Sequence, residues 1–550
     1  MLADELTKIG GRLFERAVDL HTLWQEIAEN FYPERADFTV KRSANDEFAD
    51  HLATSVPVTM RRDLGDAVGG MLRPTNKVWA HIRVSEWDQV GPTGRAWLER
   101  ANERQRRAMY HKDTQFVRAA KEADHDFITF GNSILQITTN TAANGLLYRC
   151  WHLRDCVWSE GPDGPIDTVF RRWKTAAINV VRMFPKTVHA DIRRKAQEEP
   201  FCEVELWHCE VPSDITGDDT PRKLGRQTKS VYLDVANKHI MEEVDLMELS
   251  YNIARWRTLS GSQYGYSPAT MAALPDSRTM QEMMITLLEA GEKATTPPLI
   301  GVQEALRGDI NVMAGGVTWV DREYDERLGE VLRPLTVDKN GIPLGMDMRQ
   351  ELKAEMADIF YLSKLFLPPL GGPDMTAYEV GQRVQEHIRQ TLPLFEPMET
   401  ECNAPIYEKT FNLLLRFNVF GQQTDIPEEL QGKEVRFEFE SPLHDAVERV
   451  KTQKYLEATS LLANAAGVDP NAIHIMDFNK GAKDALMGSG VPAAWLRTDA
   501  EVEQIMQQIA EKQQAEMLLQ QMQQGADIAK TVGMTPSPAG TGGTSGPTPI

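Results

Sequence analysis

The residues of this sequence best suited to bind a metal ion are cysteines and histidines in one region of the chain: Cys150, His152, Cys156, Cys202, His208 and Cys209. Thiolate and imidazole groups are ligands that zinc prefers, and structural zinc sites place them at short, regular spacings. The spacing here matches no known zinc module. Half-buried cysteine and histidine side chains on strands account for the same residues. We therefore expect no metal site.

A glycine-rich loop before a helix can cradle phosphate, and residues 255–276, RWRTLSGSQYGYSPATMAALPD, have that form. Gly261 and Gly265 permit a tight bend, and Ser267-Pro268 is typical of a cap followed by a first-turn proline. The chain contains no GxxxxGK[ST], HExxH or GxSxG motif. Its acidic residues are plentiful but scattered. Carboxylate pairs could be assembled from almost any acidic chain, so they do not indicate nuclease or hydrolase chemistry. We expect no bound nucleotide, no cofactor and no catalytic residues.

Charge and length narrow the function classes further. The chain has 550 residues, room for about three or four domains, and a formal net charge of −20. A protein that grips nucleic acid over a broad surface needs clustered Lys and Arg, whereas a wall of like charge repels DNA that slides past it. The basic runs Arg171-Arg172-Trp173-Lys174 and Arg193-Arg194-Lys195 are short, and we expect them on solvated faces or at subunit contacts.

Targeting signals are weak. No apolar run approaches the roughly 20 residues that span a bilayer, and the start, MLADELTKIGG, lacks the features of a signal peptide. Five cysteines in so long a chain indicate no disulfide framework. We expect a reducing compartment and no membrane contact.

The elements that must position any site are organised around residues 362–390, where a helix end, a breaker and a helix start follow one another. Apolar residues of the first helix recur at helical spacing: Met348, Leu352, Met356 and Ile359. Pro368-Pro369 should stop this helix, because proline lacks an amide hydrogen and clashes with the preceding turn. Gly371-Gly372 then permits positive φ, and Pro373 stiffens the exit.

The second helix should begin at Thr376 and run to about residue 391. Thr376 and Glu379 have the spacing of a capping box, and Met375 and Val380 that of a hydrophobic staple. On this pattern alone, the stretch is an ordinary helix–loop–helix inside a large helical protein.

Residues 373–383, PDMTAYEVGQR, resemble the Thr-Ala-x-Glu-Val stretch of the portal, or head-to-tail connector, proteins of tailed bacteriophages, especially the short-tailed class. Residues 155–180 resemble the wing region of that family, and residues 255–276 are a further stretch that resembles the family. EFESPLHDAVERVKTQ, at 438–453, is similar to the Ser-Pro-Leu helix start near the end of connector proteins.

In that family the loop before this helix hangs into a central channel through which DNA passes. The resemblance implies that Lys364 contacts phosphates and that the proline–glycine loop acts as a mechanical gate without reading bases. It also implies that a channel loop lies nearest the DNA: Leu370, Gly371, Gly372, Pro373, Asp374 and Met375.

Pattern and resemblance together predict an α+β fold that is mainly α. Its parts would be an α/β wing at 1–265, a first stem helix at 266–292, a small β-rich clip at 293–345, a second stem helix at 346–366, a channel loop at 367–375, a long kinked helix and return to the wing at 376–440, a helical crown at 441–530 and a disordered tail at 531–550.

Within the wing and stem, helical spacing predicts helices at 3–31, 55–73, 92–111, 114–130, 176–184, 186–197, from 277 onward and at 406–418. Short β-rich runs predict strands at 77–84, 133–139, 146–152, 167–173, 202–211, 229–235, 297–302, 310–320, 330–337 and 432–440. Pro275-Asp276 should break the chain just before the helix that begins at Ser277.

The resemblance implies a structural protein and not an enzyme: a ring of about twelve copies at the one capsid vertex where DNA enters and leaves. Its implied partners are further copies of itself, the terminase large subunit, the major capsid and scaffolding proteins, tail adaptor or nozzle proteins, and double-stranded DNA bound without sequence specificity. It would be assembled in the host cytoplasm and remain in the virion. The alternative is a DNA-processing enzyme of a packaging machinery, an ATPase or nuclease, although the missing phosphate-binding loop argues against the ATPase.

Overall fold

The computed structural model describes residues 2–42, 48–75, 78–84, 90–140, 144–215, 228–297, 299–301, 332–334, 341–365, 396–422 and 425–439, with short pieces between 455 and 512. The chain divides into two compact units, Met1–Val447 and Glu448–Ile550. The predicted channel loop, the predicted tail and most of the predicted crown lie outside the described residues. No described helix is long and apolar enough to cross a membrane.

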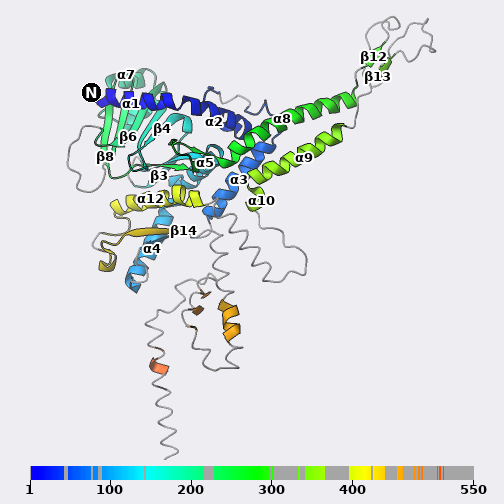
Figure 1. Cartoon of the computed structure of the whole chain (residues 1–550). Helices are drawn as coiled ribbons and strands as arrows, with labels where there is room; N and C mark the ends of the chain where they lie inside the picture. Colours follow the sequence, from blue (N-terminus) through cyan, green and yellow to red (C-terminus); the bar gives the residue numbers. More distant parts are fainter. Residues whose placement is uncertain are drawn as a thin grey trace, which may run out of the picture. The chain divides into compact units, whose positions relative to one another are not determined.

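Two antiparallel sheets form the centre of the first unit (Figure 1). The larger has the order β4-β5-β6-β7-β8, from β4 (Cys156–Glu160), β5 (Ile166–Ala176), β6 (Glu203–Pro212), β7 (Thr228–Asp234) and β8 (His239–Leu246). The smaller has the order β3-β2-β9, from β3 (Leu146–Cys150), β2 (Asn132–Thr139) and β9 (Tyr251–Arg255). Strands β2, β3, β5, β6 and β7 lie where β-rich runs predict them, whereas β4, β8 and β9 carry too little apolar alternation to be predicted.

Helices cover both faces of the larger sheet. Successive side chains of a strand point to opposite faces, and here both faces carry apolar side chains that the helices bury. On one face, α1 (Leu2–Arg16) packs against Phe170 and Trp207. A Cβ at Gly10 would come within 2.8 Å of the Phe170 ring, so glycine lets the helix approach the sheet closely. On the other face, α6 (Ala177–Met183) and α7 (Ala190–Glu198) pack against Leu206.

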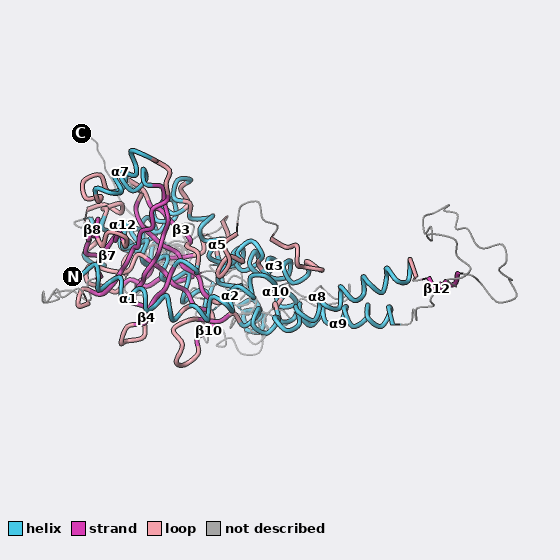
Figure 2. The backbone as a smooth tube through the Cα atoms, turned by 90° about the horizontal axis from the view of Figure 1, so that it is seen from above, coloured by secondary structure: helices cyan, strands magenta, loops and turns pink. Residues whose placement is uncertain are grey.

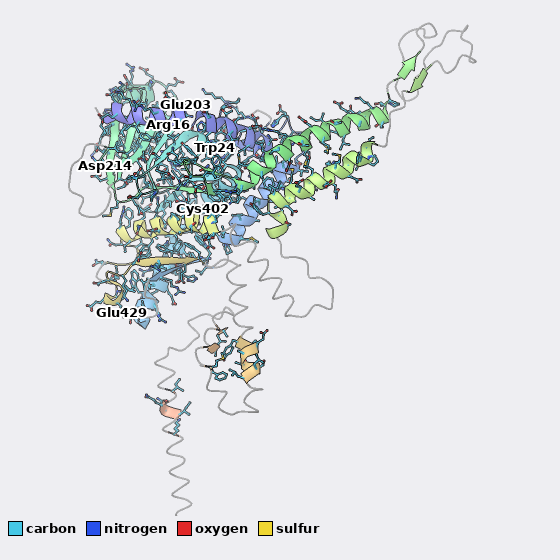
Figure 3. The ribbon with its side chains drawn as sticks, in the orientation of Figure 1. Arg16, Trp24, Glu203, Asp214, Cys402 and Glu429 are labelled. Atoms are coloured by element: carbon cyan, nitrogen blue, oxygen red, sulfur yellow. The ribbon has the colours of Figure 1, made fainter. Side chains whose placement is uncertain are left out.

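A helical layer adjoins the sheets. It consists of α2 (Val18–Phe31), α3 (Val56–Leu72), α5 (Phe116–Phe130) and the start of α8 (Pro268–Thr295). Trp24 lies at its centre (Figure 3). Gly131 ends α5 at φ +73°, and a Cβ there would lie 2.1 Å from the backbone of Tyr266. Ser267 caps α8 by accepting a hydrogen bond from Thr270 N at 3.2 Å.

A fourth core joins segments far apart in the sequence. Strand β1 (Ala80–Val84) pairs with β14 (Val435–Phe439) in antiparallel register, with Ala80 opposite Phe439. Helices α4 (Pro92–Met109) and α12 (Ala404–Arg416) pack on this ribbon. The buried Tyr407 of α12 donates to Asn102 Oδ1 of α4 at 2.7 Å, which fixes the two helices to each other.

Helices α8 and α9 (Gly341–Ile359) run side by side (Figure 2). Arg349 Nη1 lies 3.6 Å from Met284 Sδ, and a Cβ at Gly345 would lie 2.7 Å from Leu287 Cδ2. Because rising numbers on α8 meet falling numbers on α9, the pair is antiparallel. Beyond it, the short strands β12 (Leu299–Gly301) and β13 (Leu332–Pro334) pair with each other.

Two helix predictions were wrong in their boundaries. The helix expected at 3–31 is interrupted at Ala17, between α1 and α2. Pro275 does not interrupt the chain but lies inside α8, which begins at Pro268. Burial of Ala269, Ala273 and Leu274 in the helical layer stabilises the turn that lacks the proline's hydrogen bond.

Candidate functional site

The predicted channel loop is bounded by two described segments. Upstream, α9 ends at Ile359, Tyr361 adopts φ +57°, and a short helix α10 (Leu362–Leu365) follows. Lys364 lies in α10, where its backbone alone is described. Downstream, the described chain resumes at Glu396. The other predicted site residues lie outside the described residues: Leu370, Gly371, Gly372, Pro373, Asp374, Met375, Thr376 and Glu379.

The end of α9 corrects the expectation that Pro368-Pro369 stops this helix. Phe360 N still donates to Met356 O at 2.9 Å, but Tyr361 N donates to Asp358 O, one residue nearer, at 3.0 Å. This tighter final turn and the left-handed Tyr361 end α9 before either proline.

The upstream boundary is anchored by apolar packing. Phe360 is 0% exposed, and its ring centroid lies 5.5 Å from that of Phe31 on α2. Met356, one turn earlier, is equally buried in the same core. Ser363 Oγ of α10 donates to Asp358 Oδ1 at 2.7 Å, which holds the short helix against the end of α9.

The downstream boundary enters the same core. Met398 and Cys402 are buried in the cluster that contains Met356 and Phe360. Directly after Met398 the chain forms a π-helical turn, Glu399–Asn403, which contains Cys402, and α12 follows at once. Both ends of the stretch 366–395 are therefore fixed in one hydrophobic core.

A buried ion pair supports the downstream boundary. Arg73, which caps the C-terminus of α3, pairs with Asp124 of α5, and its Nη1 donates to Asn403 Oδ1 at 3.1 Å. Burial alone would lower the pKa of Arg73, but the Asp124 carboxylate outweighs burial and raises that pKa. The guanidinium therefore stays charged and links α3, α5 and the π-helical turn.

The next two residues of α5 are also paired with arginines. Arg35 donates to both oxygens of Asp126, at 3.1 and 2.7 Å. Arg61 Nη1 lies 3.0 Å from His125 Nδ1. Sequence reasoning missed these pairs, because Asp-His-Asp in a helix is more typical of a solvated face than of a core.

The α8–α9 pair carries a different surface feature. Large apolar side chains remain exposed along its outer half: Ile285, Leu288, Leu344, Met346 and Met348. Such side chains on facing helices are typical of a surface that another protein covers.

The cysteines and histidines that sequence analysis considered for a metal ion have separate environments. His152 Nε2 lies 2.7 Å from Asp37, and His208 contacts Tyr251 and Ser230. Burial raises the pKa of the Cys209 thiol, which packs among apolar residues. Among the described residues, no group of three or more His, Cys, Asp or Glu side chains could hold a metal ion.

Of the basic runs, that on α7 is exposed as expected, but the expectation for Arg171 was wrong. Arg171 is buried, because β5 is an inner strand of the sheet and alternate residues point into the molecule. Its guanidinium carbon lies 3.7 Å from the ring centroid of Trp151.

Comparison of the sequence with known proteins identifies a family that matches most of the chain. The model of the bacteriophage head to tail connecting proteins matches residues 3–496. The chain is 25% identical over 526 residues to the probable portal protein of Bordetella phage BPP-1, covering 93% of this chain and 91% of that protein. It is 21% identical over 385 residues to the portal protein of Salmonella phage epsilon15, covering 68% of each.

Two solved necks of gene transfer agent particles also match. The neck of an empty particle computed with C6 symmetry gives a TM-score of 0.35 at 10% identity, over 74% of this chain and 86% of that chain. The neck of a native particle computed with C12 symmetry gives 0.34 at 9% identity, over 74% and 85%. The assignment rests instead on the family match across most of the sequence: this chain belongs to the bacteriophage head to tail connecting proteins, a family of structural proteins and not of enzymes.

Proposed function

We propose that this chain is one subunit of a closed ring at the capsid vertex, and that DNA passes through the ring during packaging and ejection. The family match over residues 3–496 is the observation that carries the proposal. Two features of the described residues support it. Both boundaries of the stretch 366–395 are fixed in one core, and the α8–α9 pair exposes apolar side chains.

The channel would be bordered by Lys364 and the loop Leu370–Met375 of each copy. Lys364 would contact phosphates, and the proline–glycine loop would act as a mechanical gate without reading bases. Firm boundaries suit that role, because force on the loop would pass into a packed core. The net charge of −20 per chain, about −240 for twelve copies, would keep the grip on DNA weak and make it weaker as salt rises.

The ring would close through a second copy of this chain on the exposed apolar side chains of α8 and α9. Repeated head-to-tail contacts close when the rotation between copies divides a full turn, and about twelve copies is the number proposed. Residues 293–345 would contact the terminase large subunit and later a tail adaptor or nozzle protein. Major capsid and scaffolding proteins would be its partners when the head assembles in the host cytoplasm, and the ring would remain in the short-tailed virion.

The test removes Leu370–Gly372 from the full chain. If the loop gates DNA, heads carrying the deletion should still assemble but should neither fill with DNA nor retain it. The matched control is Gly11→Ala on α1, where an added Cβ meets no atom within 4 Å beyond the backbone of its own helix, and which should leave packaging intact. Normal packaging by the deletion variant would remove the channel role while leaving the family assignment untouched.

A further inference from the structure

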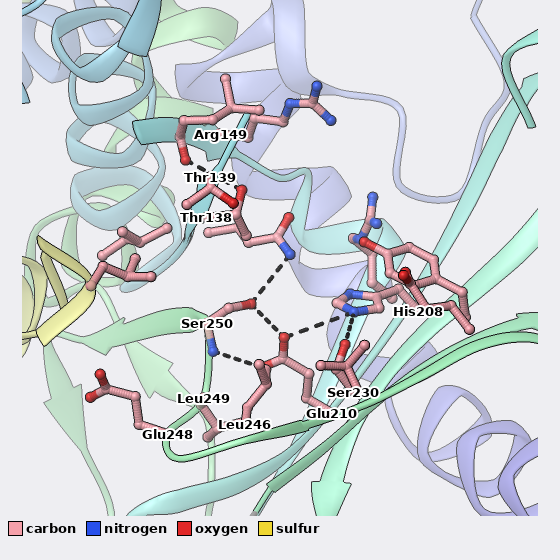
Figure 4. Close-up of a pocket in the computed structure, with 18 of the residues that line it drawn as sticks. Thr138, Thr139, Arg149, His208, Glu210, Ser230, Leu246, Glu248, Leu249 and Ser250 are labelled. Atoms are coloured by element: carbon pink, nitrogen blue, oxygen red, sulfur yellow. Dashed lines mark hydrogen bonds and ion pairs between the residues drawn. The ribbon is translucent and has the colours of Figure 1, made fainter. Parts of the chain in front are cut away.

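A cavity of about 500 Å³ lies among the larger sheet, β2, β3 and α12 (Figure 4). Its walls include His208 and Glu210 of β6, Ser230 of β7, and Val244 of β8. Val244 is 42% exposed, so the cavity opens to the surface beside the edge strand of the sheet. None of the proposed ring or channel roles uses this cavity.

Arg171 forms part of the cavity wall and is 2% exposed. Its guanidinium carbon lies 3.7 Å from the Trp151 ring centroid and 5.0 Å from that of Trp173, and its Nε donates to Tyr251 Oη at 2.9 Å. Its Nη1 has no hydrogen-bond partner among the described residues. A buried cation normally has its hydrogens satisfied, so this one has an unused donor beside an open cavity.

A chain of hydrogen bonds supplies a second donor. Arginine can only donate, so the Tyr251 oxygen accepts from Arg171, and we assign the Tyr251 hydrogen to His208 Nδ1, 2.5 Å away, where a neutral imidazole can accept it. Burial, followed by the nearby Arg171 charge, lowers the pKa of His208, so the ring is neutral. Its one proton is then on Nε2 and goes to Ser230 Oγ at 2.8 Å. The Ser230 hydroxyl hydrogen is left to donate onward.

Three acids line the cavity, Glu210, Glu242 and Glu248, and two of them have hydrogen-bond partners of their own. Glu210 accepts from the Ser250 amide at 2.7 Å and from the Ser250 hydroxyl. Glu248 accepts from Asn412 at 3.2 Å and lies 3.9 Å from Arg416. Apolar and aromatic side chains complete the lining: Ile137, Leu147, Trp173, Phe184, Tyr232 and Leu413.

We propose that this cavity binds a carboxylate attached to an apolar body, with the carboxylate on Arg171 and Ser230. A singly charged carboxylate with two oxygens matches the unpartnered Nη1 of Arg171 together with the Ser230 hydroxyl. The carboxylate comes either from a free small acid or from an acidic side chain of a peptide.

Equilibrium dialysis of the purified full chain against radiolabelled hexanoate tests the proposal, with hexanol as the neutral probe of equal length. Hexanoate should occupy one saturable site per chain, with hexanol at least about tenfold weaker. A short peptide with one glutamate should compete better than its glutamine counterpart if the source is a peptide side chain, and both should compete equally poorly if it is a free acid. Competition by inorganic phosphate as strong as by hexanoate would overturn the choice of carboxylate.

Variants locate the site. Arg171→Gln should weaken hexanoate binding at least about tenfold. Because Arg171 is buried and its loss could disturb folding, Val244→Trp provides an independent test by filling the mouth from an exposed position. Asp245→Trp, on the same strand but outside the lining, is its control and should bind as the unmodified chain does. Unchanged binding by Val244→Trp, or no saturable binding by the unmodified chain, would exclude the site.

Discussion

Phe360 offers the sharpest test of how the predicted channel segment is held. Its side chain is 0% exposed and contacts Phe31 at a centroid distance of 5.5 Å, just before the stretch 366–395. Replacing a fully buried phenylalanine by alanine removes its transfer free energy and leaves a cavity, a loss of about 3–5 kcal/mol in the free energy of unfolding. Because whole domains are stable by about 5–15 kcal/mol, Phe360→Ala should remove a large share.

The assay is urea unfolding followed by tryptophan fluorescence, combined with limited proteolysis. Phe201→Ala is the matched control, since Phe201 is 82% exposed and should change stability by less than about 0.5 kcal/mol. A double-mutant cycle of Phe360→Leu with Phe31→Leu should give a coupling of about 0.5–1.5 kcal/mol for the aromatic pair. Proteolysis between 361 and 396 should accelerate in Phe360→Ala alone. Equal stability of Phe360→Ala and Phe201→Ala would refute the anchor.

Three further predictions follow from the described residues. Gly131→Ala should destabilise the first unit by more than about 2 kcal/mol, because its φ is +73° and a Cβ would meet backbone at 2.1 Å, whereas Gly11→Ala should be neutral or stabilising by up to about 1 kcal/mol in a thermal melt. Arg73→Met or Asp124→Leu alone should cost about 3–5 kcal/mol by leaving a buried charge unpaired, and the double variant should recover part of that loss in urea unfolding. Burial lowers the pKa of His21 from 6.5 to about 4, so unfolding titrations should show stability falling between those pH values, by at most about 3 kcal/mol, and His21→Phe should remove that part of the fall.

The sign of the pH effect follows from proton uptake. Between pH 6.5 and 4 the unfolded chain protonates His21 while the folded chain keeps it neutral, so acid favours unfolding. An identical acid response in His21→Phe would contradict this assignment. For the ion pair, strictly additive losses in the double variant would show that Arg73 and Asp124 do not interact. A harmless Gly131→Ala would mean that the end of α5 does not approach Tyr266 as described.

Local patterns predicted the helices well where caps and periodicity act within a few residues. The helix expected at 114–130 corresponds to α5, with Gly131 as its stop, and Ser267 caps the helix that follows it. The prediction that Pro275 breaks the chain was wrong. The residues of α8 around Pro275 are buried in the helical layer, and this packing cannot be seen from the local sequence.

Contacts between residues far apart in the sequence could not be predicted from local patterns. Arg73 and Asp124 are 51 residues apart, and nothing local distinguishes them from the other charges of the chain. Arg171 was expected at the surface because it belongs to a short basic run. It is buried because β5 is an inner strand, and that position depends on pairings between strands distant in the sequence. Of the candidate site, Met356 lies on the predicted helix, whereas the roles of Phe360, Met398 and Cys402 emerge only from packing. The channel roles of Lys364 and Leu370–Met375 stay predictions.

Native mass measurement with electron microscopy of the purified full chain tests the central claim most directly. The account predicts a closed ring with a central hole, at roughly 600–800 kDa for about twelve chains of 62.0 kDa each, with the stretch 366–395 at the hole. A monomer, or a ring in which that stretch lies on the outer rim, would contradict it.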